Sequence, residues 1–188
     1  MRQNLGPRDR ILETAARLFY KQGYNSTGIN QILEEAKVAK ASLYQHFKSK
    51  EDVGVEYLKL ARIEWFAGLE QWTSKKSTPA QKLIACFDFL EYALTHNEFR
   101  GCKFINILAE LADAETRIQR QVVEHKEKLR DHIKGFVRQT LSHQGAEKIE
   151  SIGDAVYLLF EGAIVESKIF RDTWPTKAAR KIVRTLLE

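Results

Sequence analysis

Hydrogen-bonding side chains are concentrated in a short segment in the first quarter of the chain. The segment 40–50, KASLYQHFKSK, combines lysine, serine, tyrosine, glutamine and histidine. Lysine and serine bind phosphate oxygens or base edges, glutamine pairs with adenine, and alanine or tyrosine contacts a thymine methyl group. These residue types indicate a surface that reads double-stranded DNA.

The positive charge of the chain is concentrated in the same region. The net charge is +5, and residues 1–50 hold nine Lys or Arg against four Asp or Glu. Residues 51–188 hold 21 of each kind. Such asymmetry indicates a partner with a negative surface. Nucleic acid is favoured over a membrane because no basic amphipathic helix with a broad apolar face accompanies the charge.

The spacing of apolar residues predicts how these side chains are positioned. Apolar residues recur every three or four positions along the chain, without bounded period-two stretches, so the sequence predicts an all-α protein. In the helix expected over residues 40–47, Leu43 and Phe47 share one face and point to the core. The opposite face and its flanks carry Lys40, Ala41, Ser42, Tyr44, Gln45 and His46.

Two further helices complete an N-terminal three-helix head. The first is expected from Pro7, a residue suited to a first helical turn, to Gly23. Thr27 is expected to cap the second helix, and residues 37–39 form a break before the third. A helix, a tight turn and a second helix form a helix-turn-helix unit, which reads DNA. Thr27 and Lys50, at helix starts, are expected to contact DNA phosphates.

The rest of the chain continues the helical pattern at greater length. Ser49 is expected to cap a long fourth helix, and Thr78 with Pro79 begins the next one. Further helices are expected over residues 49–72, 79–96, 102–112, 113 or 114–144, 147–170 and from 173 onward. The sequence thus predicts a helix-turn-helix DNA-binding domain over residues 1–50 and a helical dimerisation and ligand-binding domain over residues 51–188.

The segment Ile11–Val53 resembles the TetR family of bacterial transcriptional regulators. The resemblance is carried by Ala15-Ala16-x-Leu18-Phe19, Gly23-Tyr24, Thr27, Ile32 and Leu43-Tyr44-x-His46-Phe47-x-Ser49-Lys50-Glu51. It implies an all-helical homodimer whose heads bind a pseudo-palindromic operator. It also implies C-terminal domains that dimerise and usually bind a small effector, which releases the DNA. Beyond the head, the similarity is confined to helix order and to the stretch 100–111, RGCKFINILAEL.

The turn before the third helix departs from the family pattern. The family often has glycine, valine, serine and lysine where this chain has Lys37, Val38, Ala39 and Lys40. A left-handed backbone conformation at residue 37 is less favourable for lysine than for glycine. A common Gly-Ala pair is also replaced by alanine and serine at 41 and 42, which indicates a different base preference.

Aromatic and apolar side chains of the second domain allow two interpretations. Their helical spacing is typical of core packing, yet pockets between bundle helices are lined by the same residue types. An apolar effector pocket is expected to involve Trp65, Phe66, Leu69, Phe87, Phe104, Leu108 and Phe160.

Small residues in the helix expected over 147–170 permit close packing of backbones. This helix and the last one suit a two-fold, four-helix interface between two copies of the chain. The alternative is that both helices only complete the core of one copy. The interface candidates are Ile152, Val156, Leu159, Ala163, Ile182 and Leu186.

Signals for catalysis and metal binding are lacking. The sequence has no HExxH, no nucleotide-binding glycine loop and no GxSxG, so we expect no enzyme activity, catalytic residue, metal or cofactor. His125 and His132 are seven residues apart on a charged stretch and are expected to be solvated. Cys86 and Cys102, the only cysteines, are expected to be reduced thiols, with a redox switch as the alternative.

These observations together predict a ligand-responsive repressor. It is expected to bind its operator as a homodimer and to be released by a small apolar effector. The lack of a long apolar run or a signal peptide predicts a cytoplasmic protein without a membrane partner. The alternative function is a helical sensor or protein-interaction module without sequence-specific DNA binding, in which the basic helix is a solvated or protein-binding surface.

Overall fold

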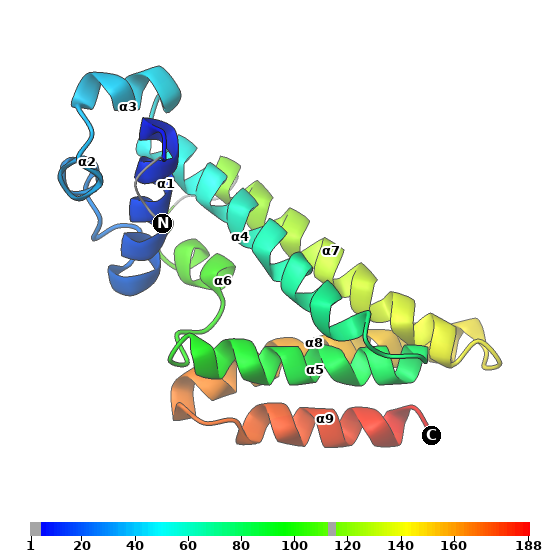
Figure 1. The fold of residues 1–188 in the computed structure, drawn as a ribbon. Helices are drawn as coiled ribbons and strands as arrows, with labels where there is room; N and C mark the ends of the chain where they lie inside the picture. The colour runs from blue at the N-terminus through cyan, green and yellow to red at the C-terminus, as the bar shows by residue number, and fades with distance from the viewer. Residues whose placement is uncertain (1–4, 113–115) are drawn as a thin grey trace. The chain divides into compact units, whose positions relative to one another are not determined.

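The computed structural model describes residues 5–112 and 116–188, and in these residues every regular element is a helix (Figure 1). The prediction of an all-α protein is confirmed. The helices are α1 (Pro7–Gln22), α2 (Ile29–Ala36), α3 (Lys40–His46), α4 (Lys50–Thr73), α5 (Pro79–His96), α6 (Lys103–Leu108), α7 (Arg117–Thr140), α8 (Ala146–Phe170) and α9 (Trp174–Leu186). The predicted start of the seventh helix at 113 or 114 lies outside the described residues.

The described residues form two compact units. The head unit comprises residues 5–63, 103–112 and 116–124, and the bundle unit comprises residues 64–102 and 125–188. Helices α4 and α7 contribute residues to both. Compactness therefore groups residues 51–63 and the α6 segment with the head, although the sequence prediction assigned them to the second domain.

The helix boundaries in the head follow mostly from local signals. Pro7 occupies the first turn of α1, and Gly23 ends this helix with a φ of 100°, a conformation that glycine adopts without strain. The prediction that Thr27 caps α2 is wrong, because Gly28 is the N-cap. The Thr27 hydroxyl instead donates a hydrogen bond to the Gly23 carbonyl oxygen at 2.7 Å, and its side chain is wholly buried.

The core of the head unit confirms the predicted phase of α3. Leu43 and Phe47 are 0% and 2% exposed, and α3 packs against α1 and α2, in which Ile11 and Ile32 are also fully buried. Burying such a side chain stabilises the fold by about 1.5–3 kcal/mol. The inward face of α3 is therefore fixed by apolar burial, which leaves its polar face to solvent.

Two predicted N-caps are confirmed. The Ser49 hydroxyl oxygen accepts a hydrogen bond from the Asp52 N–H at 3.1 Å and so caps α4. Thr78 caps α5 in a reciprocal arrangement with Gln81, and Pro79 follows in the first turn. These caps satisfy N–H groups that have no partner within the helix.

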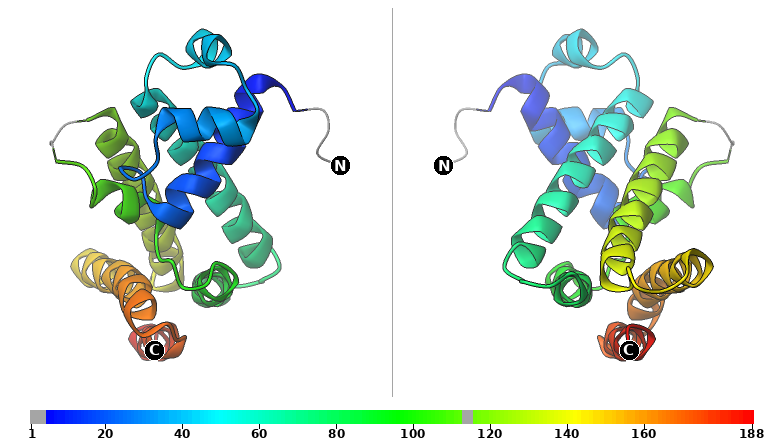
Figure 2. Two further views of the ribbon diagram at one scale, coloured as in Figure 1. Left: turned by 90° about the vertical axis from the view of Figure 1, so that its left-hand side faces the viewer. Right: turned by 90° about the vertical axis from the view of Figure 1, so that its right-hand side faces the viewer.

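The bundle unit is built on α5, α8 and α9, with the later parts of α4 and α7. Helix α9 packs against both α8 and α5, and Figure 2 shows α8 and α9 side by side. The core of the bundle unit includes the fully buried rings of Phe87 and Phe160. The long helix was predicted to end at Gln144, but α7 ends four residues earlier, at Thr140. Gly145 is the N-cap of α8. No helix in the described residues is long and apolar enough to span a lipid bilayer.

Candidate DNA interface and effector surfaces

The outward face of α3 carries the predicted DNA-reading residues. Tyr44 is 52% exposed, and Ser42 is half-buried. The other exposed members of this face are Lys40, Ala41, Gln45 and His46. The face thus presents an ammonium group, an amide, an imidazole and a phenol to solvent, with a small side chain among them.

The turn between α2 and α3 forms without glycine. Lys37 adopts the left-handed conformation, with φ of 54° and ψ of 49°. Its N–H bonds the Glu34 carbonyl oxygen, and the next N–H, from Val38, bonds the Leu33 carbonyl oxygen at 3.0 Å. Arg10 of α1 donates to the Lys37 carbonyl oxygen at 3.2 Å. These contacts hold the turn in a conformation that costs a non-glycine residue about 1–2 kcal/mol.

The two residues predicted to contact phosphates from helix starts, Thr27 and Lys50, lie in different environments. Thr27 is wholly buried and its hydroxyl is used internally, so its side chain cannot contact DNA in this conformation. The Lys50 ammonium lies 4.4 Å from the centre of the Tyr24 ring and 3.5 Å from the Asn25 carbonyl oxygen. Burial lowers the pKa of Lys50, which Glu110 opposes. Lys50 is thus held against the α1–α2 turn rather than extended into solvent.

One exposed cation beside α3 was not among the predicted contacts. Lys48 is exposed in the connection to α4, and in the described part of the chain its ammonium forms no ion pair. Its backbone N–H bonds the Asp52 carboxylate at 2.7 Å, which fixes the connection. The pair of lysines at 48 and 50 is the sequence feature that could have indicated Lys48 as a DNA contact.

The first turn of α4 is clamped by Arg117 from the start of α7. The guanidinium makes two hydrogen bonds with Glu51, at 2.8 and 3.1 Å, and its other terminal nitrogen lies 2.6 Å from an Asp52 oxygen. Hydrogen bonding to Arg117 lowers the pKa of Glu51. For Asp52, burial raises the pKa, but Arg117 and local N–H groups outweigh it and the net pKa is lowered. Both carboxylates are therefore held in the ionised form.

The predicted effector-pocket residues are divided between the two units. Phe104 and Leu108 belong to the head unit. In the bundle unit, Phe87 packs edge-on to Phe160, with ring centres 5.2 Å apart. Trp65, Phe66 and Leu69 also pack in or against this core. Core packing is thus an established role of these five bundle residues, and a pocket formed by them stays a prediction.

The prediction that the two histidines of α7 are solvated is wrong. His125 is 2% exposed, and its ring lies edge-on to Phe66 at 5.8 Å. His132 lies 5.9 Å from the same ring, and burial lowers the pKa of its imidazole. The prediction failed because lysines and glutamates surround these positions in sequence, while the face on which the histidines lie turns inward.

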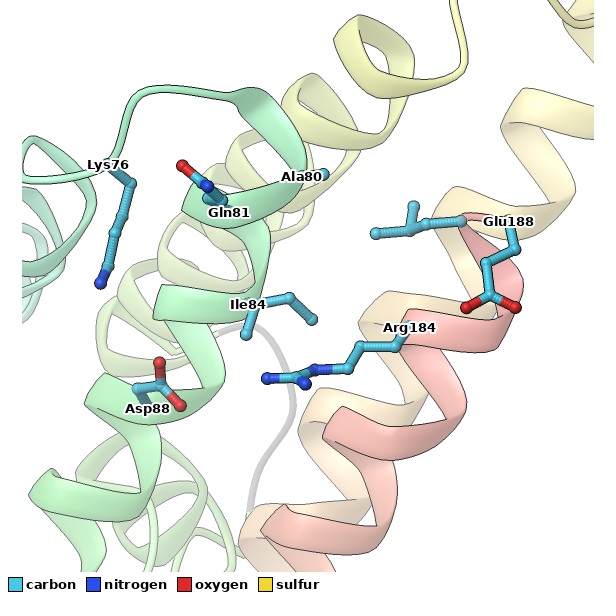
Figure 3. A pocket seen from close by; sticks show the side chains of 8 residues that line it. Lys76, Ala80, Gln81, Ile84, Asp88, Arg184 and Glu188 are labelled. Carbon is cyan, nitrogen blue, oxygen red and sulfur yellow. The ribbon is translucent and has the colours of Figure 1, made fainter.

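A surface groove lies between α5 and α9 of the bundle unit (Figure 3). It has a volume of about 650 Å³. In Figure 3 the Arg184 side chain extends from α9 toward Ile84 of α5. The lining residues are Lys76, Ala80, Gln81, Ile84, Asp88, Arg184, Leu187 and Glu188. None of the predicted effector residues lines this groove.

The predicted interface residues divide between the core and the surface. Val156 and Ala163 are 0% and 4% exposed and face the bundle core, so their assignment to a surface between subunits is corrected. Ile152, Leu159 and Leu186 are half-buried, and Ile182 is 47% exposed. Other large apolar side chains of these helices are exposed but were not predicted, among them Leu158, Val165 and Ile169 on α8 and Trp174 on α9. Together with Ile182 we call these four the outward apolar stripe.

The two cysteines are free thiols in the structure. Cys86 is fully buried, and burial raises its pKa to about 12. Cys102 is half-buried, with the Lys126 ammonium 3.7 Å from its sulfur. The two thiols therefore lie in unlike environments.

Comparison with known proteins gives two family matches. Residues 11–56 match the family described as bacterial regulatory proteins, tetR family. Residues 79–183 match the tetracyclin repressor-like C-terminal domain. The second match alone spans more than half of the chain, and the first contains α2, the turn and α3.

Individual relatives agree with these matches. The chain is 38% identical over 69 residues to the transcriptional regulator QacR of Staphylococcus aureus, covering 37% of this chain and 35% of QacR. It therefore spans about a third of the length of that relative. It is 25% identical to the repressor DhaR of a Mycobacterium species over 89% of this chain and 85% of DhaR. The crystal structure of SCO4454, a TetR-family regulator from Streptomyces coelicolor, superposes with a TM-score of 0.87 at 28% identity, covering 96% of this chain and 94% of that one.

Proposed function

The chain belongs to the TetR family of bacterial regulatory proteins, which are DNA-binding transcriptional regulators and not enzymes, and from this membership we propose that it is a repressor. It binds a pseudo-palindromic operator as a homodimer in the cytoplasm, and a small apolar effector releases it. The repressor DhaR is similar over most of both chains, which supports the sign of regulation.

The observation that carries DNA reading is the polar, exposed face of α3. A helix of this length fits the major groove, and its side chains match the donor and acceptor pattern of base edges. Gln45 is suited to adenine, and Lys40 to guanine or phosphate. Lys48 adds a sequence-independent phosphate contact. The Thr27 side chain makes no contact with DNA because it is buried.

The outward stripe of α8 and α9 supports the homodimer. Leu158, Ile169 and Trp174 are 66%, 64% and 50% exposed, which is unusual for large apolar side chains gathered on adjacent helices. A two-fold axis through such a stripe makes it complementary to itself. Two heads related by this axis read half-sites about 34–36 Å apart, or at a related spacing.

Release by an effector requires two states of the dimer. An effector that binds the bundle unit more tightly in the state with the wrong head spacing lowers the population able to bind DNA. A nearly complete switch needs about a 10⁴-fold preference for that state, or about 5.5 kcal/mol. Helices α4 and α7 contribute residues to both units, and the connection between α5 and α6 also passes from one unit to the other, so these three segments are the covalent routes for this coupling.

Substitution of Tyr44 tests the reading face directly. Tyr44→Ala is expected to weaken binding to the DNA upstream of the chain's own gene by about fivefold or more, because a contact to a base edge contributes about 1–3 kcal/mol. The measurement is a fluorescence anisotropy titration at two salt concentrations, with unrelated DNA of equal length as reference. Tyr92→Ala is the matched control, since Tyr92 is 50% exposed on α5 against 52% for Tyr44.

The outcome separates the two candidate functions. A wild-type preference of about 10³ or more for one DNA, lost in Tyr44→Ala and kept in Tyr92→Ala, supports a sequence-reading regulator. A selection of bound genomic fragments supplies the operator if the upstream DNA shows no preference. Wild-type binding that is equal for all fragments and erased by salt contradicts it and favours a helical sensor without DNA reading.

A further inference from the structure

The turn between α1 and α2 binds a carboxylate from a distant part of the chain. Glu110, two residues beyond the end of α6, accepts the Tyr24 N–H on one oxygen at 3.1 Å and the Asn25 N–H on the other at 2.6 Å. The Asn25 side-chain amide donates in return to the Glu110 carbonyl oxygen at 2.5 Å. Three hydrogen bonds therefore join segments that are 85 residues apart.

The conformation of the turn is adapted to this carboxylate. A Cβ atom at Gly23 would lie 2.8 Å and 3.1 Å from the two Glu110 carboxylate oxygens, which is too close. Only glycine leaves the space, and its φ of 100° aims the following N–H groups at one point. Successive N–H groups arranged in this way bind an anion. Here the anion is a side chain of the protein itself.

The same turn holds Lys50. The ammonium of this residue lies 3.5 Å from the Asn25 carbonyl oxygen and 4.4 Å from the centre of the Tyr24 ring. In this turn the N–H groups of Tyr24 and Asn25 therefore bond Glu110, while the Asn25 carbonyl oxygen and the Tyr24 ring contact Lys50. Lys50 also begins α4, where its position at a helix start predicts a contact with a DNA phosphate.

We propose that Glu110 is a positioning residue for DNA binding, which fixes the α1–α2 turn and through it the ammonium of Lys50. This inference rests on the proposed DNA-binding function. It identifies the segment after α6 as the part of the chain that sets how one phosphate-binding cation is presented. When Glu110 is withdrawn, two N–H groups lose their acceptor, the turn relaxes, and the ammonium loses its fixed position.

The charge of Glu110 acts in the opposite direction to its hydrogen bonds. Burial lowers the pKa of Lys50, and the Glu110 carboxylate partly opposes this shift; the same negative charge repels a DNA phosphate. The effect of positioning is expected to exceed the repulsion, because the carboxylate is held by two N–H donors that spread its charge. Removing Glu110 is therefore expected to weaken DNA binding, whereas repulsion alone would make removal strengthen it.

A double-mutant cycle distinguishes positioning from general stability. Glu110→Ala and Lys50→Ala are each expected to weaken binding about tenfold and to lower the slope of log K against log salt by about one. In the Lys50→Ala background, Glu110→Ala is expected to change affinity by less than about twofold. Glu127→Gln, an exposed change on α7, serves as the control and is expected to change neither quantity.

Amide hydrogen exchange gives a readout that does not involve DNA. In the free protein, the Tyr24 and Asn25 amides are expected to exchange at least about tenfold faster in Glu110→Ala than in the wild type, because their acceptor is lost. Glu110→Gln retains one acceptor oxygen and is expected to show an intermediate rate. It replaces Glu110→Ala in the cycle if the alanine variant does not fold.

The results decide between the inference and its failure. Faster exchange of both amides together with unchanged DNA affinity and salt slope would overturn the inference. An equal loss of affinity in both Lys50 backgrounds would also overturn it, since it would show a purely structural role. The salt slope is measured on unrelated DNA as well, so the cycle remains decisive even if the wild type shows no operator preference, a result that contradicts the proposed function instead.

Discussion

The role that a single side chain of this protein can take depends on the groups that surround it in space. Lys50 is basic in sequence and suggests a freely extended side chain, but its ammonium is positioned by the Tyr24 ring and the Asn25 carbonyl oxygen. His125 lies among charged neighbours in sequence and is 2% exposed. At this scale residue type indicates chemistry, while burial decides whether that chemistry is available.

The two thiols provide a prediction at the residue scale. Cys102 is expected to react with iodoacetamide in the folded protein, whereas Cys86 is expected to remain unmodified, because it is fully buried and its pKa is raised to about 12. Mass spectrometry of peptides after timed alkylation at pH 8 measures both rates. Denatured protein is the control, in which the rates should converge. Equal rates in the folded state would contradict the burial of Cys86.

Local signals explain most element boundaries. Pro7, Ser49 and Thr78 mark helix starts, because proline fits a first turn and a hydroxyl oxygen accepts an otherwise unpaired N–H. Thr27 was misassigned because the same hydroxyl has a second use, a hydrogen bond to a carbonyl oxygen four residues earlier. A capping residue type is therefore informative only where no competing acceptor lies nearby.

The helix-turn-helix turn gives the first prediction at the element scale. Lys37→Gly is expected to raise the free energy of unfolding by about 0.5–1 kcal/mol, because glycine adopts the left-handed conformation without the steric cost that lysine bears. Urea denaturation followed by circular dichroism measures the change. Lys37→Ala keeps a Cβ atom and is the control, expected within about 0.5 kcal/mol of the wild type. A destabilised glycine variant would show that the lysine side chain itself supports the turn.

The clamp of Arg117 on α4 gives a prediction on pH. The pKa values of Glu51 and Asp52 are lowered in the folded protein, so their ionisation stabilises the fold above their ordinary values of 4.5 and 3.8. This contribution is lost as pH falls through the lowered folded-state values. Arg117→Gln is expected to lower the Tm at pH 7 and to have the same Tm as the wild type near pH 2.

The measurement for this clamp is differential scanning calorimetry from pH 2 to pH 7. Arg120→Gln, an exposed change one turn further along α7, is the control and should leave the pH profile unchanged. A deficit in the Arg117 variant that persists unchanged at the lowest pH would assign the effect to lost packing rather than to the ion pairs.

At the scale of the whole molecule, the packing units and the sequence families divide the chain differently. The C-terminal family match covers residues 79–183, yet residues 103–112 and 116–124 pack in the head unit. A segment that belongs by sequence to the regulatory domain thus contacts the DNA-binding head.

The proposed homodimer gives the prediction at this scale. Ile169→Asp is expected to convert the homodimer to a monomer and to abolish binding to a palindromic operator, because it places a charge in an apolar stripe. Analytical ultracentrifugation measures the assembly. Val123→Asp is the matched control, since Val123 is 47% exposed on α7 and outside the stripe. A wild-type monomer, or a variant that remains dimeric, would reject the stripe as the interface.

The sequence by itself determined the all-helical class, the helix-turn-helix and the orientation of Leu43 and Phe47. The reason is that the spacing of apolar residues and helix capping depend on residues that are close together in the sequence. Only the tertiary structure decided that Glu110 binds a turn 85 residues away. It also decided that Val156 faces the core while Leu158 faces outward. Both positions are apolar on one helix, and their exposure depends on which side the neighbouring helices cover.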